Sequence, residues 1–261
     1  MTVLKSIIAT LIFSTILLMM PSFNSVTADI TDEDELILVV GASGRTGSYV
    51  IKYLKQQGRN FVPMTSNKDR ATKKFSEKYN WVEADVKKPE SLDSIMVGVT
   101  KIISGLGTSE YEGPNSPEYI DYGGTKNLIN AAEKAGTVNQ FIQMSSSGVT
   151  DKDHPLNRFG NILVWKLKAE DYIRSSSIAH TIIRPGGLTN DEAGVKGVRM
   201  LQGDSVTGMT SRGNLAAICI EALSNQDAKN KTFEAFDDKT LKPDAWRETF
   251  SKLISDEKLN K

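Results

Sequence analysis

The chain has 261 residues, of which 39% are hydrophobic, and its 32 Lys and Arg residues balance 32 Asp and Glu residues. This length allows one large domain or two small ones with a substantial core, and the balanced charge argues against a protein whose main task is binding nucleic-acid phosphates or anionic lipid. The single cysteine, Cys219, excludes an intramolecular disulfide, and only two histidines, His154 and His180, exclude a multi-histidine metal site.

Residues 1–28 have the pattern of a secretory signal peptide. Lys5 is their only charge, a largely apolar stretch runs from Ile7 to Met20, and small residues stand at the end, where signal peptidase cleaves. The apolar stretch is shorter than the ~20 residues that span a bilayer. We therefore expect export to the outside or to an organelle lumen, with a plastid as destination if the source is an alga; an uncleaved membrane anchor is the alternative.

Residues 29–35 (DITDEDE) are expected to form a solvated acidic linker, and strands and helices alternate after it. The strands are expected at residues 36–40, 60–65, 81–84, 101–104, 139–144, 179–183 and 231–236. The helices are expected at residues 48–57, 69–79, 89–97, 117–135, 156–175, 212–223 and 243–254. This alternation predicts one α/β domain over residues 36–261, in which a doubly wound parallel sheet carries helices on both faces and binds ligands at the carboxyl ends of its strands.

A glycine-rich loop, Gly41-Ala-Ser-Gly44-Arg-Thr-Gly47, joins the first expected strand to the first helix. Gly41 permits a tight turn, Gly44 lets the backbone approach a pyrophosphate, and Gly47 lets the helix pack close to the strand. The amides and dipole at the start of the helix then face the negative charge. The motif predicts a Rossmann-type dinucleotide site; an ordinary strand-to-helix turn that needs small residues is the alternative.

The residues that follow the second expected strand favour NADP(H) over NAD(H). An acidic residue at this position would bond the adenosine 2′-hydroxyl and repel a 2′-phosphate. Ser66 and Asn67 stand there instead, and the only acid, Asp69, is expected in the next helix. Three side chains supply positive charge: Arg45, Lys68 and Arg70.

Seven further motifs follow the glycine loop in order along the chain. They are Ala84–Val86, Ile102–Gly107, Asp121–Ala132, Phe141–Thr150, Asn161–Tyr172, Thr181–Leu188 and Ser211–Ala216. Together with the loop they resemble the atypical short-chain dehydrogenases/reductases of the NAD(P)H-binding, NmrA-like type, above all those of plants and photosynthetic microbes. The resemblance covers roughly residues 36–236.

This resemblance implies a role for each block in binding a nicotinamide dinucleotide. The pyrophosphate would be held by Gly41, Ser43, Gly44, Arg45, Thr46 and Gly47. Asp85 and Val86 would contact the adenine, and Gly105 and Leu106 would line the central ribose. At the nicotinamide end the resemblance implies Ser145, Ser146, Pro185, Gly186 and Lys166. Among these, Lys166 would bond the nicotinamide ribose, and Ser146 and Lys166 are the candidate catalytic residues.

One position departs from the pattern of the superfamily. Typical members carry a tyrosine four residues before the lysine as general acid, and here that residue is Ile162, which cannot transfer a proton. The assignment of Lys166 uses the spacing to Glu170, and choosing Lys168 instead would place Val164 at the tyrosine position. The alternative for Lys166 is a simple helical pair with Glu170.

Four other side chains are candidates for the missing acid or for simpler roles. His154 lies in a loop after the fifth strand and is either an acid over the substrate or an exposed loop residue. Tyr119 and Tyr122 begin the long helix and are interpreted as packing or cofactor contacts. His180 opens a strand and is interpreted as structural.

Two classes of function remain compatible with these residues. The first is an NADPH-dependent reductase of a small carbonyl, quinone or flavin-like acceptor; quinones and flavins take protons from solvent and tolerate the missing tyrosine. The second is a non-catalytic NADP(H)-binding redox sensor or assembly factor. In either case residues 187–210 are expected to close over the ligand, and no metal, nucleic acid or membrane span is expected in the mature chain.

Overall fold

The fold is described from a computed structural model, which describes residues 35–259. The predicted signal peptide and nearly all of the predicted linker lie outside the described residues. Eight strands form one sheet in the order β3-β2-β1-β4-β5-β6-β10-β8. Their bounds are β1 Ile37–Val40, β2 Phe61–Thr65, β3 Val82–Glu83, β4 Lys101–Ser104, β5 Gln140–Met144, β6 Ala179–Pro185, β8 Gly197–Leu201 and β10 Lys231–Asp238. All neighbours pair in parallel except β10 and β8, which confirms the predicted doubly wound parallel sheet.

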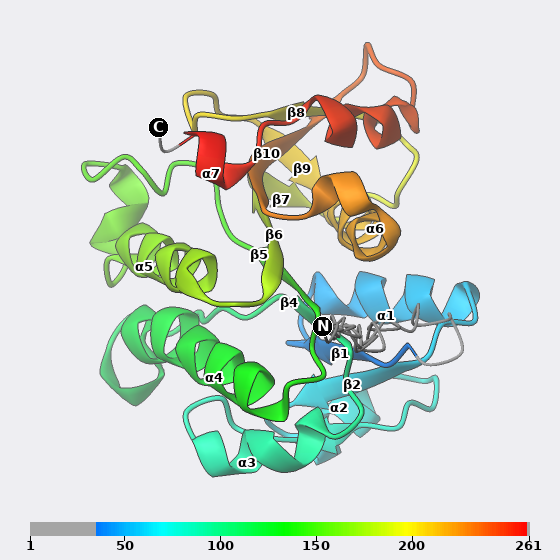
Figure 1. Cartoon of the computed structure of the whole chain (residues 1–261), viewed down its shortest axis with the longest axis vertical. Coiled ribbons are helices and arrows are strands. Elements are labelled where there is room, and N and C mark those ends of the chain that lie inside the picture. Colours follow the sequence, from blue (N-terminus) through cyan, green and yellow to red (C-terminus); the bar gives the residue numbers. More distant parts are fainter. Residues whose placement is uncertain (1–34, 260–261) are drawn as a thin grey trace, which may run out of the picture.

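Helices cover both faces of this sheet (Figure 1). On one face lie α1 (Gly47–Gln56) and α6 (Arg212–Ser224), which pack against each other. On the other face lie α3 (Pro89–Asp93), α4 (Thr125–Ala135) and α5 (Ile162–Ser175). A short helix, α2 (Lys68–Lys74), follows β2. The strand order reverses between β1 and β4, so a ligand is expected at the carboxyl ends of these two strands.

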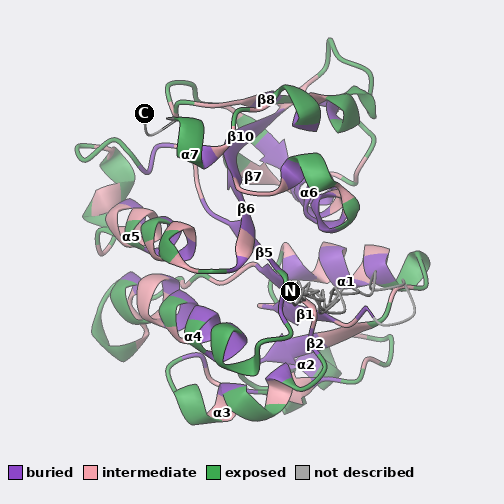
Figure 2. Cartoon of the chain, in the orientation of Figure 1, coloured by how far each residue is buried: buried purple, intermediate pink, exposed green. Residues whose placement is uncertain are grey.

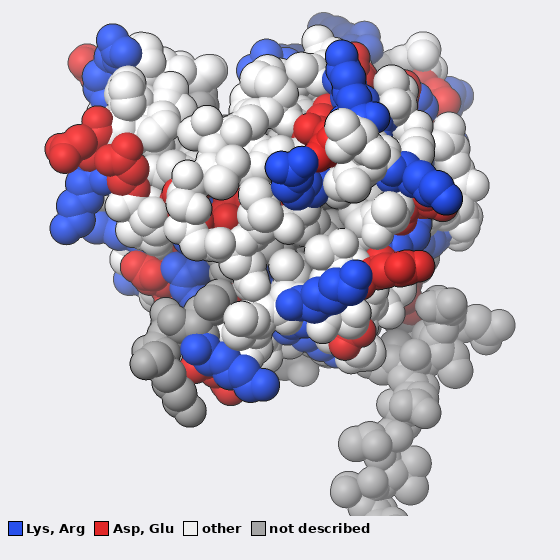
Figure 3. All heavy atoms as spheres, turned by 90° about the horizontal axis from the view of Figure 1, so that it is seen from above, with Lys and Arg blue, Asp and Glu red and all other residues white. Residues whose placement is uncertain are grey.

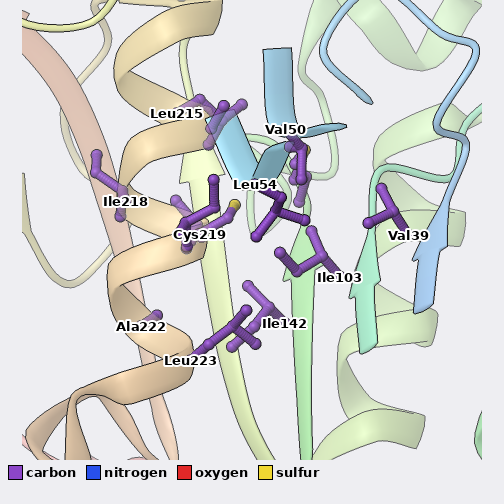
Figure 4. Packing of buried hydrophobic residues seen from close by; sticks show 14 of the residues in the cluster. Val39, Val50, Leu54, Ile103, Ile142, Leu215, Ile218, Cys219, Ala222 and Leu223 are labelled. Atoms are coloured by element: carbon purple, nitrogen blue, oxygen red, sulfur yellow. The ribbon is translucent and has the colours of Figure 1, made fainter. Parts of the chain in front are cut away.

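The sheet divides the core into two layers because successive side chains of a strand point to opposite faces. Ile37 and Val39 of β1 pack with α1 and α6, whereas Leu38 and Val40 pack with α3 and α4. The central strands are buried along their whole length (Figure 2). Figure 4 shows the first layer, where Cys219 points in among apolar side chains; burial raises the pKa of its thiol, as expected of an inert core cysteine.

Several predicted helices are shorter than expected, each for a local reason. The helix predicted at 69–79 ends at Lys74, after which Phe75 packs its ring 5.2 Å from that of Trp81. The helix predicted at 156–175 begins at Ile162, because Gly160 and Asn161 both have positive φ. Residues 155–158 form a separate 3₁₀ turn, η5 (Pro155–Arg158). The helix predicted at 243–254 is a 3₁₀ segment, η7 (Ala245–Lys252).

The long helix predicted at 117–135 begins with a π-helical segment, η4 (Glu118–Gly124), before α4. Residues 187–210 contribute strands to the fold. They contain β7 (Gly187–Thr189) and β9 (Met209–Ser211), which pair with each other, and β8, which extends the main sheet. Much of this segment is therefore part of the sheet architecture, and its expected closure over the ligand stays a prediction.

Glu35, which was expected at the end of a solvated linker, is buried instead. Its carboxylate receives a bidentate hydrogen bond from Arg59 and lies 2.6 Å from Lys101 Nζ. Burial opposes ionisation, but Lys101 and Arg59 together hold the pKa of Glu35 below its usual value. The folded domain therefore includes Glu35.

His180 and Asp256 form a buried pair that fastens the C-terminal helix α7 (Asp256–Leu259) to the sheet. His180 Nε2 lies 2.9 Å from Asp256 Oδ2, and the backbone N–H and hydroxyl of Thr232 both donate to the same carboxylate. The structural interpretation of His180 is thereby confirmed. Burial opposes ionisation of Asp256, but the hydrogen bonds from His180 and Thr232 outweigh it and hold its pKa below the usual value.

Asp256→Asn is expected to lower the free energy of unfolding by about 2 kcal/mol at pH 7, since hydrogen bonds to a charged group are lost. Because the pKa of Asp256 is lower in the folded than in the unfolded state, its carboxylate stabilises the fold at pH values above the unfolded pKa. This stabilisation is lost as the pH falls through about 4 and below. Urea unfolding at pH 7, 5 and 3.5 should therefore show the variant converging on the wild type at the lowest pH. The exposed neighbour Glu257, changed to Gln, serves as control; a deficit that stays constant with pH would contradict this role of Asp256.

Candidate cofactor site

The glycine loop packs more tightly than any side chain would allow. Gly41 has a φ of +73°, and a Cβ there would lie 2.9 Å from the carbonyl oxygen of Gly105 at the end of β4. A Cβ on Gly47 would lie 2.2 Å from the carbonyl oxygen of Gly41. The loop thus brings the start of α1 against the ends of β1 and β4, which leaves backbone amides at the helix start available to a phosphate.

A pocket of about 560 Å³ opens beside this loop, at the carboxyl ends of β1, β2, β3 and β4. This volume is in the usual range for ligand sites. The pocket is lined by these predicted residues: Gly41, Ser43, Gly44, Ser66, Asn67, Asp85, Val86, Gly105 and Leu106. The structure therefore brings together the residues expected around the adenosine, the pyrophosphate and the central ribose, although they come from four separate segments.

The end of the pocket next to β2 is polar and carries positive charge. Ser43 Oγ lies 3.1 Å from Thr65 Oγ1, and the Asn67 side chain caps α2 by accepting from the backbone N–H of Arg70. Arg70 itself lines the pocket. Lys74, which the sequence analysis did not single out, donates to the carbonyl oxygen of Ser43 at 2.7 Å and so brings a further ammonium to the glycine loop.

Val86 and Leu106 form the apolar middle of the pocket. Both pack against Gly124, where a Cβ would lie 2.7 Å from Val86 Cγ2 and 2.9 Å from Leu106 Cδ2. Asp85 accepts at Oδ1 from the backbone N–H of Lys87, so its side chain is held by its own turn. An apolar slot with polar ends suits a flat base and the phosphorylated ribose attached to it.

The predicted nicotinamide-end residues follow β5 and β6, beyond the lining of this pocket. Ser145 is buried and donates to Glu170 Oε1 at 2.6 Å, so its hydroxyl is engaged in a buried network. Ser146 is more exposed, and its hydroxyl donates to the carbonyl oxygen of Ser147. Pro185 is buried, and Gly186 packs so closely that a Cβ would lie 2.0 Å from the carbonyl oxygen of Gly208.

Lys166 does not pair with Glu170, as the helical spacing suggested, but with Asp121 of η4. Its Nζ lies 2.7 Å from Asp121 Oδ1, and both side chains are largely buried. Glu170 is bonded instead to Arg184, Arg174 and Ser145. Ile162 is the first residue of α5, one turn before Lys166, so no hydroxyl stands at the position of the usual tyrosine.

The other candidate acids differ in their surroundings. Tyr122 stacks on Trp165 with ring centroids 5.9 Å apart, which agrees with its interpretation as a packing or cofactor contact. Tyr119 is 52% exposed and lines an outer groove of 730 Å³ that shares Lys87 with the pocket. His154 accepts at Nδ1 from the backbone N–H of Leu156 and packs against Gly148.

Arg45 and Thr46 lie at the outer end of the glycine loop and do not line the pocket, although Thr46 is the residue before α1. Arg45 is exposed, and its charge acts on Arg212 at the start of α6. Arg212 donates to the carbonyl oxygens of Leu188 and Thr189, and burial together with Arg45 lowers its pKa.

Within residues 35–259 no group of three or more His, Cys, Asp or Glu side chains has an arrangement that could hold a metal ion. No helix among these residues is both long and apolar enough to cross a membrane. Lys, Arg, Asp and Glu side chains are interspersed over the face shown in Figure 3, without a large region of one sign.

Comparison with known proteins gives results that agree with this geometry. The sequence profile of a family described as NAD(P)H-binding matches residues 41–226. An uncharacterised chloroplastic protein of Arabidopsis thaliana is 34% identical over 80% of this chain and 72% of its own. Sanguinarine reductase of Eschscholzia californica is 32% identical over 76% of this chain and 87% of its own. A putative NAD-dependent epimerase/dehydratase from Bacillus halodurans superposes with a TM-score of 0.73 at 27% identity, covering 84% of this chain and all of that one.

Proposed function

Because the chain belongs to the NAD(P)H-binding family, we propose that it is an NADPH-dependent reductase of a small carbonyl, quinone or flavin-like acceptor. The observation that carries the proposal is the arrangement of the pocket. It runs from the glycine loop to Gly107, and the ammonium of Lys166 stands next to Gly107. The similarity to sanguinarine reductase supports a reductase rather than an epimerase.

NADP(H) is the favoured cofactor because of the charge at the end of β2. Arg70 lines the pocket there, Lys74 lies at Ser43, and no carboxylate follows β2 before the helix that begins at Lys68. Asp69 is exposed in that helix. A 2′-phosphate would therefore meet positive charge and hydroxyl groups rather than an acid.

When bound, the nicotinamide would supply the hydride, and the residues of this chain would bind and orient. The glycine loop would hold the pyrophosphate, Val86 and Leu106 would hold the apolar adenosine half, and Lys166 would donate to the nicotinamide ribose. Ser146 is the remaining serine with an accessible hydroxyl beside this end. With Ile162 in place of tyrosine, a proton comes from solvent, which suits quinones and flavins better than simple ketones.

The alternative is an NADP(H)-binding sensor or assembly factor without catalysis. The same Ile162 favours it, since no positioned acid replaces the tyrosine in the described residues. The two functions share the pocket and differ only in turnover. Measurement of binding and of NADPH oxidation on the same preparation therefore separates them.

For the N-terminal segment we propose a targeting role. Residues 1–28 have the pattern of a cleavable signal, and relatives at 34% identity are chloroplastic proteins of Arabidopsis thaliana and pea. We propose that the segment directs the chain into a plastid. The relative from pea, the chloroplastic protein TIC 62, matches over only 33% of its own length, so its role is not transferred to this chain.

NADPH should bind the purified protein at least tenfold more tightly than NADH, and NADPH should be oxidised in the presence of menadione, FMN or an aromatic aldehyde. Isothermal titration gives the two affinities, and absorbance at the wavelength of NADPH gives turnover. Tight binding without oxidation of any acceptor would favour the sensor. Binding of neither nucleotide would overturn both functions.

The source of the preference for NADPH is tested by Arg70→Ala. This change should weaken NADPH binding about tenfold and leave NADH binding unchanged, because a charge-assisted hydrogen bond to the 2′-phosphate is worth about 1.5–3 kcal/mol. Lys73→Ala is the matched control, since Lys73 is exposed on the same helix and does not line the pocket. An equal loss for both nucleotides would show that Arg70 does not contact the 2′-phosphate.

A further inference from the structure

Asp121 and Lys166 form an ion pair at the end of the pocket nearest to the expected nicotinamide. The Asp121 side chain is 1% exposed and that of Lys166 is 14% exposed. A Cβ on Gly107, which lines the pocket, would lie 3.5 Å from Asp121 Oδ1 and 3.8 Å from Lys166 Nζ. Both charges therefore lie in van der Waals contact range of Gly107 at the pocket wall.

The ion pair is not fully satisfied within the described residues. Both carboxylate oxygens of Asp121 are buried and have no hydrogen-bond partner there, although Oδ1 lies 2.7 Å from Lys166 Nζ as an ion pair; Thr125 Oγ1, four residues further along, is also buried and without a partner. Burying two charges costs several kcal/mol per ion, and an apolar pair of similar volume usually stabilises a fold equally well. Stability alone therefore does not account for a buried carboxylate without hydrogen bonds among the described residues at this place.

The backbone that carries Asp121 is itself unusual. Asp121 lies in the π-helical segment η4, and such segments are frequent at functional sites because an extra residue in the turn changes the direction of the side chains. In this segment Tyr119 is exposed, whereas Asp121 is buried against Lys166. The π-helical turn thus directs a carboxylate inward at the position where α5 passes.

On the premise of the proposed dinucleotide site, we propose that Asp121 is the positioning residue for Lys166 and aims its ammonium at the nicotinamide ribose. No other acid is available to hold Lys166 from its own helix, because Glu170 is bound to Arg184 and Arg174. An ammonium has three N–H donors, so pairing with one carboxylate leaves donors for the ribose hydroxyls. With Ile162 unable to contribute a hydroxyl, Asp121 takes over the orientation of the lysine.

The test compares two ligands that share the adenosine half. NADPH carries the nicotinamide ribose, whereas 2′,5′-ADP carries only the phosphorylated adenosine. Asp121→Asn keeps the shape of the side chain but removes its charge, and it should weaken NADPH binding about tenfold while 2′,5′-ADP binds within twofold of wild type. Isothermal titration of both ligands to the full chain measures this, and a thermal melt of each variant records the effect on folding.

A second variant shows whether Asp121 acts through Lys166. Lys166→Ala should also weaken NADPH binding, and adding Asp121→Asn to it should cause less than a twofold further loss, since the two changes remove the same interaction. Asp93→Asn is the control: it breaks the exposed pair of Asp93 with Lys134 and should change neither affinity.

Three results would overturn the positioning role of Asp121: an equal loss for both ligands, unchanged NADPH binding, or independent losses that multiply in the double variant. Failure of the proposed function looks different, because the wild type itself would then bind neither NADPH nor 2′,5′-ADP.

Discussion

Gly47→Ala is expected to abolish detectable NADPH binding, with a loss of more than 100-fold, and to lower the free energy of unfolding by about 2 kcal/mol. The added Cβ would lie 2.2 Å from the carbonyl oxygen of Gly41 and 2.7 Å from Ala42 Cα. Both are backbone atoms, so the loop must move away from the start of α1 to relieve the contact, and overpacking of this kind costs about 1–3 kcal/mol. The amides that would face the pyrophosphate move with it.

The control for this prediction is Gly58→Ala, at the other end of α1. Gly58 has a φ of +68° and no atom within 4 Å of a Cβ, so alanine there costs roughly 1–2 kcal/mol of backbone strain without any contact at the pocket. Urea unfolding should show both variants destabilised, and titration with NADPH should show loss of binding only for Gly47→Ala. Normal binding by Gly47→Ala would mean that the loop does not hold the dinucleotide.

The sheet and the adenosine half of the site could be predicted from the sequence because their signals are local. Apolar runs such as 36–40 specify strands buried on both faces, and the glycine spacing specifies one turn between a strand and a helix. Because the carboxyl ends of parallel strands meet at one edge of the sheet, a parallel arrangement brings Asp85 and Gly105 to the glycine loop. Nine of the predicted residues line this pocket, whereas Arg45, Thr46 and Gly47 do not.

The partner of Lys166 could not be predicted in the same way. Spacing of four residues places Lys166 and Glu170 on neighbouring turns of one helix, and this local rule favours a pair between them. The actual partners are set by elements distant in the chain: Arg184 of β6 binds Glu170, and Asp121 of η4 binds Lys166. The helical periodicity of a sequence does not show which residues of distant elements form ion pairs. It also does not predict the π-helical turn that directs Asp121 inward.

The strands within residues 187–210 could not be predicted for a related reason. Its strand β8 pairs antiparallel with β10, more than thirty residues further along the chain, and forms the last strand of the sheet at that edge. Gly197 lies at one end of this pairing, where a Cβ would meet Leu241 at 2.6 Å. Short strands whose partner is remote leave a weak alternation in the sequence, so no strand was predicted in this segment.

Glu170→Ala is expected to give the largest loss of stability of any change considered, about 3–5 kcal/mol. Glu170 is fully buried and binds Arg184 through both carboxylate oxygens, at 3.1 Å and 2.6 Å, while also accepting from Ser145 and Arg174. Removing it leaves the buried guanidinium of Arg184 with Glu234 as its one remaining carboxylate, at 3.3 Å. Breaking one side of a buried ion pair costs this much because the other charge stays buried without compensation.

The matched control is the next residue in the helix, Asp171, whose side chain is 65% exposed and pairs with Arg174. Asp171→Ala should change the free energy of unfolding by less than about 0.5 kcal/mol, since exposed pairs contribute little. Urea unfolding at pH 7 compares the two variants directly. Glu170 also accepts the hydrogen bond of the Ser145 hydroxyl at the end of β5. Loss of this bond should therefore also weaken NADPH binding by the folded molecules of the Glu170→Ala variant. Equal stability of the two variants would show that Glu234 alone compensates the charge of Arg184. The ends of β5 and β6 would then be held together by backbone hydrogen bonds, such as that from Ser145 to Ile183, rather than by the buried charges.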